Sequence, residues 1–125
     1  MNGWLFAAGT VAAATALIHI IAGGRDVVRP LLAGPMPAEP TRTLHVVWHF
    51  VSADLLLSAA ALIVVSLRAE PHTPLVLFIA AQYFAYTAAF LVGTLTAPWT
   101  RPLLRLPQWM LLLPIGTLAT IGAGL

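Results

Sequence analysis

Residues 4–23 read WLFAAGTVAAATALIHIIAG and contain no charged residue. A helix needs about 20 apolar residues to cross the hydrocarbon core of a bilayer. Further windows of this kind follow at about residues 44–67, 74–96 and 108–125. These runs lack the alternation of apolar and polar residues that barrel strands show. We therefore predict an all-α membrane protein, an antiparallel bundle of four transmembrane helices that forms one integral membrane domain over residues 1–125.

The composition agrees with a protein that faces lipid. Only 8% of the 125 residues are charged and 60% are hydrophobic, whereas a soluble domain carries about 25% charged residues. The six basic residues are all arginine, and they are dispersed between the apolar windows rather than gathered in a basic run, so we do not expect nucleic-acid binding. The absence of cysteine excludes disulfides, thiolate metal sites and cysteine catalysis.

The arginines also predict an orientation. Five of them fall in the segments 24–43 and 97–107, which we expect to be loops because they are polar and rich in proline: Arg25, Arg29, Arg42, Arg101 and Arg105. The opposite side has only Arg68. Positive residues favour the cytoplasmic side. We expect both loops to be cytoplasmic and both termini to lie outside, in a bacterial inner (plasma) membrane.

Three histidines are predicted in the cytoplasmic half of the membrane. His19 lies about one turn from that end of the first helix, while His45 and His49 share one face in the first turns of the second helix. Neutral imidazole is a common ligand of transition metals, and two histidines on facing helices can hold a haem iron. This pattern favours a haem or transition-metal site, but it also fits histidines that only hydrogen-bond to backbone, serine or threonine.

Arginine at the same interface adds a possible anion site. Arg25 and Arg29 follow the end of the first window, where they would pair with haem propionates or with a lipid headgroup. The alternative is that they only anchor the helix at the membrane surface.

Asp54 is the most costly residue of the predicted second helix, because an acid near mid-membrane needs a specific reason to be there. Tyr86 of the third helix falls at a similar depth and Gln82 somewhat deeper. One interpretation is a proton-titrating or ligand-binding carboxylate. The other is a hydrogen-bonded aspartate that only joins the two helices. The sequence leaves both open.

Small residues and one repeated motif complete the pattern. Ala8, Ala12 and Ala16 form a row that would let another helix approach closely, within the bundle or in a homo-oligomer. The tetrapeptide RPLL occurs at residues 29–32 and again at 101–104, by coincidence or as the trace of a duplicated helical hairpin.

Three functions are compatible with these features. The first is a His-lined cofactor protein for electron transfer or for metal or haem handling. The second is an accessory or structural subunit of a larger membrane complex, or a homo-oligomer, without chemistry of its own. The third is a small oligomeric transporter or channel that uses Asp54. The sequence does not decide whether the protein is an enzyme.

Overall fold

The computed structural model describes residues 1–124, and within this range the chain forms helices and turns without any strand. Three helical stretches are long and apolar enough to cross a membrane. They are Gly3–Ala33, which comprises α1 (Gly3–Ile18), η1 (His19–Val28) and α2 (Arg29–Ala33), then α3 (Ala38–Ser66) and α4 (Thr73–Leu95). The predicted all-helical fold is therefore confirmed.

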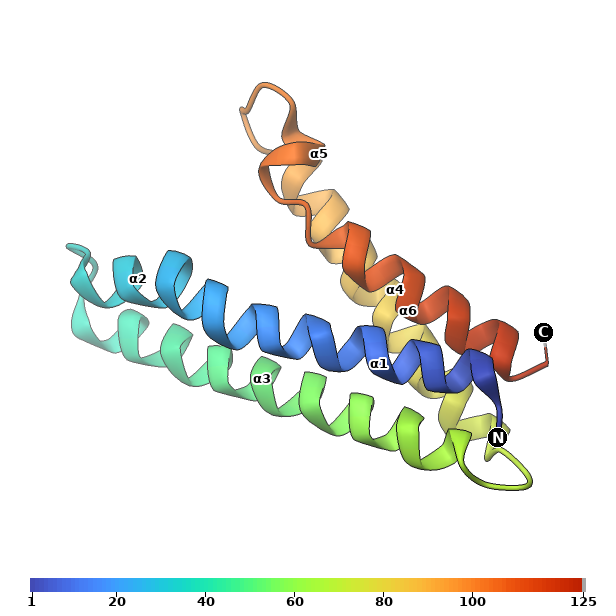
Figure 1. Ribbon diagram of the computed structural model, residues 1–125. Helices are drawn as coiled ribbons and strands as arrows, with labels where there is room; N and C mark the ends of the chain where they lie inside the picture. Colours follow the sequence, from blue (N-terminus) through green and yellow to red (C-terminus); the bar gives the residue numbers. More distant parts are fainter. Residues whose placement is uncertain (125) are drawn as a thin grey trace.

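The fourth predicted helix is shorter than expected. After the short α5 (Pro102–Arg105), α6 runs over Trp109–Gly122, a length of 14 residues. At 1.5 Å per residue this is about 21 Å, less than the hydrocarbon core of about 30 Å. Nevertheless α6 returns along α4, so that its last turn lies at the same end of the molecule as the N-terminus (Figure 1).

The prediction of a loop over residues 24–43 was wrong. The first helical stretch continues to Ala33, α3 already begins at Ala38, and only residues 34–37 form the turn. The helix continues because η1 has wide π-helical turns, in which the N–H of Arg29 donates to the carbonyl of Gly24, and because Pro30 falls in the first turn of α2. A proline there needs no N–H partner. Pro40 is similarly placed in the first turn of α3.

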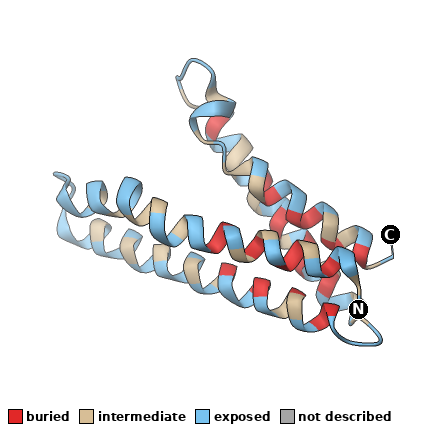
Figure 2. Ribbon diagram, viewed as in Figure 1, coloured by how far each residue is buried: buried red, intermediate tan, exposed pale blue. Residues whose placement is uncertain are grey.

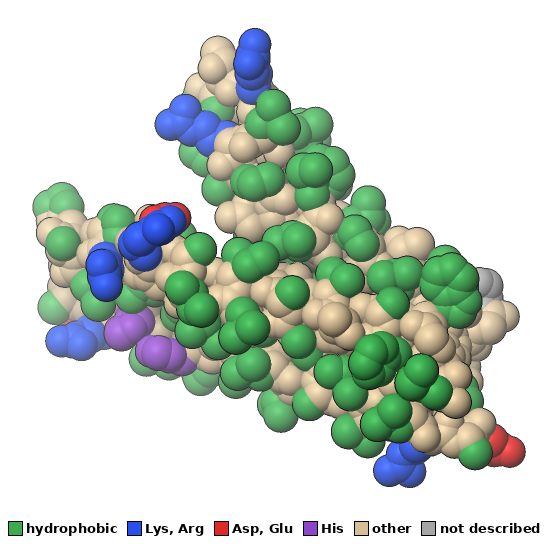
Figure 3. Space-filling view, viewed as in Figure 1, with side chains coloured by type: hydrophobic (Ala, Val, Ile, Leu, Met, Phe, Trp, Pro, Cys, Tyr) green, Lys and Arg blue, Asp and Glu red, His purple; other side chains and the backbone are tan. Residues whose placement is uncertain are grey.

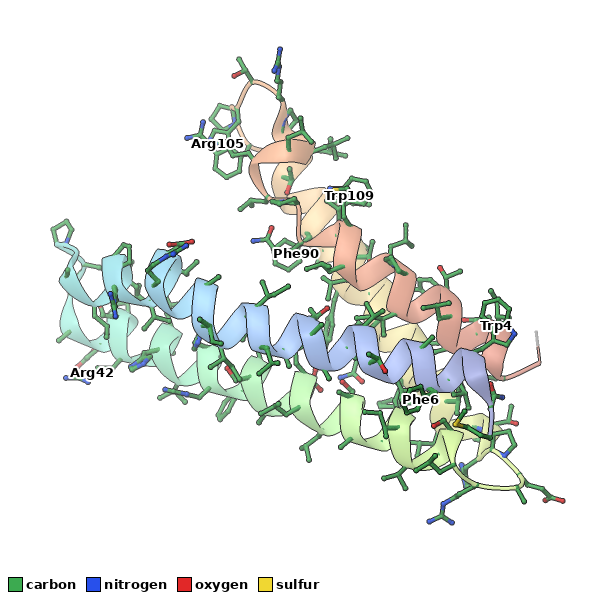
Figure 4. All side chains as sticks on the ribbon, viewed as in Figure 1. Trp4, Phe6, Arg42, Phe90, Arg105 and Trp109 are labelled. Carbon is green, nitrogen blue, oxygen red and sulfur yellow. The ribbon has the colours of Figure 1, made fainter. Side chains whose placement is uncertain are left out.

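The helices form two hairpins that diverge from a common base. Hairpin 1 comprises α1, η1, α2 and α3, and hairpin 2 comprises α4, α5 and α6. Figure 1 shows them as the arms of a V, with both termini near its base, and Figure 3 shows the open notch between the arms. Arg42 lies towards the end of one arm and Arg105 towards the end of the other (Figure 4). We call the side of the molecule where both arms end, opposite the base, the Arg-bearing end.

Burial divides the molecule into two halves. Apart from Thr94, all buried residues lie within 5–16, 55–66, 76–87 and 112–122, which we call the packed half. These segments surround the base of the V (Figure 2). The remaining parts of the long helices, which we call the open half, present half-buried and exposed side chains. Many of those are large and apolar, as a lipid-facing surface requires.

Small residues bring the helices together in the packed half. Ala8, Ala12 and Ala16 are fully buried against neighbouring helices of the same chain, so this row is used inside the bundle. Gly9 lies so close to α3 that an added Cβ would be 2.6 Å from Ile63 Cγ1. Asn2 fixes the base, since its N–H donates to the carbonyl of Ser66 at 2.8 Å.

The α3/α4 contact differs from the other helix pairs. The backbone of α1 approaches both α3 and α6, and α4 approaches α6, whereas α3 and α4 scarcely approach each other by their backbones. Side chains bridge that wider gap, among them Asp54 of α3 with Gln82 and Tyr86 of α4.

Candidate functional site

Asp54 meets Gln82 and Tyr86 between α3 and α4. Tyr86 OH donates to Asp54 Oδ2 at 2.8 Å, and Gln82 Nε2 donates to Asp54 Oδ1. The second N–H of the same amide donates to Tyr86 OH at 2.6 Å. Gln82 and Tyr86 are one turn apart on α4, which places both on the face that points to Asp54. The structure thus brings together the three residues that sequence position assigned to a similar depth.

The arrangement is suited to an ionised carboxylate. Both oxygens of Asp54 accept hydrogen bonds, and neither neighbouring side chain accepts one from it. Among residues 1–124 no arginine or histidine forms an ion pair with Asp54. The ion pair found there joins Arg25 to Asp26. All three side chains are half-buried. The site therefore offers the Asp54 carboxyl group two hydrogen-bond donors and no positive partner.

A second polar pair lies one turn deeper in the packed half. Ser58, four residues after Asp54, hydrogen-bonds to Tyr83 OH at 2.8 Å. Ser58 Oγ is also 3.2 Å from the carbonyl of Leu55, to which it donates. Tyr83 therefore acts as the donor to Ser58. Tyr83 is fully buried, and its ring meets that of Tyr86 edge-on at 5.9 Å between centroids.

The Asp54 site marks the boundary between the two halves. Asp54 immediately precedes Leu55, the first buried residue of α3, and Tyr86 immediately precedes Thr87, the last buried residue of the α4 segment within the packed half. Phe90, one turn beyond Tyr86, lies beside the notch (Figure 4). The site is consequently positioned where the two hairpins begin to separate.

His19 occupies a separate position between η1 and α3. Its ring stacks on Trp48, with centroids 3.8 Å apart and planes inclined by 16°. Its Nε2 is 3.1 Å from Ser52 Oγ, which itself donates to the carbonyl of Trp48 at 3.0 Å. Because the serine proton is used there, His19 Nε2 must be the donor, and Nδ1 carries the lone pair. A metal bound at Nε2 would have to break this hydrogen bond.

The other two histidines form a pair on α3. The rings of His45 and His49 are 4.7 Å apart, and His49 is exposed while His45 is half-buried. Within residues 1–124 no three histidine or acidic side chains come together as a group that could hold a metal ion. The predicted haem or transition-metal site therefore gains no support from the arrangement of His19, and it stays a prediction.

The two arginines of the predicted anion site have different surroundings. Arg25 pairs with its neighbour Asp26 through two hydrogen bonds of 2.6 and 3.0 Å, and both side chains are exposed. Arg29 is exposed at the start of α2. The charge of Arg25 is thus compensated by Asp26.

Sequence reasoning missed two important residues. Trp48 stacks on His19 and lies against Gly23, where an added Cβ would be 2.9 Å from Trp48 Cζ2. A glycine four residues after a membrane histidine was the available signal for this close approach. Tyr83 was missed because a tyrosine in an apolar helix resembles an ordinary core residue.

Comparisons of the chain with models of protein families, with curated proteins and with solved structures found no match. The site is accordingly interpreted from its own geometry.

Proposed function

We propose that the protein is a small proton-translocating membrane transporter, oligomeric in the membrane, in which Asp54 binds and releases the proton. The observation that carries this proposal is the half-buried carboxylate that receives hydrogen bonds from Gln82 and Tyr86 and has no cationic partner. An uncompensated charge at membrane depth is costly. Uptake of a cation relieves that cost, and a proton is the smallest cation available.

The neighbours of Asp54 are suited to both protonation states. When a proton adds to one carboxylate oxygen, that oxygen becomes a donor. Rotation of the Gln82 amide then presents Oε1 as the acceptor in place of Nε2, and the hydrogen bond from Nε2 to Tyr86 OH is given up. Tyr86 can continue to donate to the other oxygen. Because only side chains have to turn, the proton can bind and leave without loss of the α3/α4 bridge.

The proposed topology places four helices across the membrane with both termini outside. The arrangement of α6 beside α4 supports it, since the last helix returns to the end where the chain begins. The segments with most arginines, around residues 25–42 and 101–105, lie at the opposite end and would be cytoplasmic. In a bilayer, the short α6 requires local thinning or tilting of its neighbours.

Infrared titration of the detergent-purified protein tests the proton site. The chain has only four acidic residues, so the carbonyl band of a protonated carboxyl group can be assigned by substitution. We expect a protonated-carboxyl band that changes with pH, because the proposed site takes up and releases a proton. Asp54→Asn should remove it, whereas Asp26→Asn, at an exposed carboxylate paired with Arg25, should retain it.

The transport step is tested in proteoliposomes that contain a pH-sensitive dye. After an external acid pulse, wild type and Asp26→Asn should acidify the interior faster than protein-free liposomes, and Asp54→Asn should not. A titrating band that persists in Asp54→Asn would refute the site. Equal acidification by Asp54→Asn and wild type would refute its role in transport and would favour an aspartate that only joins two helices.

A further inference from the structure

The contact between α3 and α4 consists of three successive layers. The first is the Asp54 site. The second is the buried pair of Ser58 and Tyr83. The third, by residue count along the two helices, is the part of the apolar core that contains Leu62, Val76 and Ile79, which are between 0 and 4% exposed. On α3 the three layers follow at intervals of four residues, or about 6 Å. They progress from the Asp54 site towards the connector between the two helices.

The side of Asp54 that faces away from these layers is packed more sparsely, since Thr94 of α4 is the one buried residue beyond this level in α3, α4 and the first helical stretch. On α3 no residue before Leu55 is buried, and in the first helical stretch none is buried after Ala16. The hairpins separate from this level onwards, and the space-filling surface is notched between them (Figure 3). The barrier to Asp54 is thus thin on the Arg-bearing side and at least two side-chain layers thick on the other.

We infer that Asp54 is accessible only from the Arg-bearing end, and that the Ser58–Tyr83 pair together with the Leu62 layer forms a closed gate towards the termini. The inference rests on the proposed proton site for its biological meaning, because a transporter that works by alternating access exposes its site to one side at a time. The accessibility itself is a property of the packing and is measured without any transport.

Cysteine accessibility is a direct test, since the chain contains no cysteine. Single-cysteine variants are exposed in inside-out and right-side-out vesicles to a membrane-impermeant trimethylammonium methanethiosulfonate, which reacts only where water reaches the thiol. Thr100→Cys and Glu70→Cys, exposed in the turns at opposite ends, establish which side the reagent has reached. Asp54→Cys is the reporter of the site, and Gln82→Cys is a second reporter in case the first does not fold.

We expect both reporters to be labelled from the Thr100 side and protected by at least about ten-fold from the Glu70 side, as closure of a gate requires. Leu62→Ala, which opens the apolar layer, should raise labelling of the Asp54→Cys reporter from the Glu70 side. Its matched control is Leu57→Ala, because Leu57 is exposed on the same helix and should leave the labelling unchanged.

The outcomes separate the two proposals. Equal labelling from both sides, labelling mainly from the Glu70 side, or no labelling of either reporter would overturn the one-sided gate, even if Asp54 titrates. One-sided labelling with no titrating carboxyl band would retain the gate and refute the proton site.

Discussion

The close approach of α1 to α3 at Gly9 gives a quantitative prediction. In Gly9→Ala the new Cβ would lie 2.6 Å from Ile63 Cγ1, 3.0 Å from Ile63 N and 3.3 Å from the carbonyl oxygen of Ala59. Carbon atoms in ordinary contact are about 3.5–4.0 Å apart. Rotation of the Ile63 side chain can remove the first clash, but the backbone atoms can move away only if α1 and α3 separate.

The expected cost follows from this geometry. Overpacking of a close contact destabilises a protein by about 1–3 kcal/mol. Replacement of glycine by alanine in a helix contributes up to about 1 kcal/mol in the opposite sense. Gly93→Ala is the matched control, since a Cβ at this position of α4 meets no atom within 4 Å. The helix-propensity contribution is common to both variants, so their difference in stability isolates the overpacking cost of about 1–3 kcal/mol.

Denaturant unfolding in detergent, followed by circular dichroism, measures this difference. A double-mutant cycle with Ile63→Ala should show that Gly9→Ala costs less once the Ile63 side chain is removed, with a coupling of about 0.5–2 kcal/mol. If Gly9→Ala is as stable as Gly93→Ala, α1 does not approach α3 at Gly9, and the packing described for hairpin 1 is incorrect.

Three further predictions concern the remaining polar and aromatic contacts. Gly23→Ala should displace Trp48 and change its emission in a variant whose other tryptophans are phenylalanine, whereas Gly24→Ala, where a Cβ meets nothing within 4 Å, should not. Asn2→Ala removes the side-chain hydrogen bonds to the Gly122 carbonyl and the Leu5 N–H and should lower the free energy of unfolding by about 1–3 kcal/mol in the denaturant assay, so an unchanged midpoint would contradict a stabilising role of the Asn2 side chain. If the cofactor hypothesis holds, the purified protein should show a Soret band or one bound metal that His49→Ala removes, and a colourless, metal-free protein prepared with cofactor present would contradict it.

Composition and length were sufficient to predict an all-helical chain with long apolar helices. A run of about 20 apolar residues is required by the thickness of the bilayer itself, and the bounds expected for the third helix, 74–96, differ by one residue from those of α4. The continuation of the first helix through Pro30 could not be predicted in this way. Its prediction would have required knowledge of the π-helical turns of η1, which move the proline into a new first turn.

The candidate site was predictable in part for a similar reason. Counting residues from the membrane surface gives depth, and depth alone placed Tyr86 at a similar level to Asp54 and Gln82 somewhat deeper. Rotation about the helix axis and the separation between helices are set by packing, which the sequence does not state. The Ser58–Tyr83 pair depends on both quantities, and it became evident only with the structure.

The asymmetry between the two hairpins bears on how the site arose. Each copy of RPLL leads into a short helix at the Arg-bearing end, α2 in hairpin 1 and α5 in hairpin 2. If the hairpins were equivalent copies, α3 would pack on α4 as α1 packs on α6. Instead small residues bring α1 and α6 together, with Gly122 against Leu5, whereas Tyr83, Tyr86 and Gln82 hold α3 and α4 apart. The helix contact that departs from this symmetry is thus the α3/α4 contact, which contains Asp54. Close packing at three helix contacts holds the bundle together, and the α3/α4 contact is left free to carry polar side chains that would weaken a tightly packed interface.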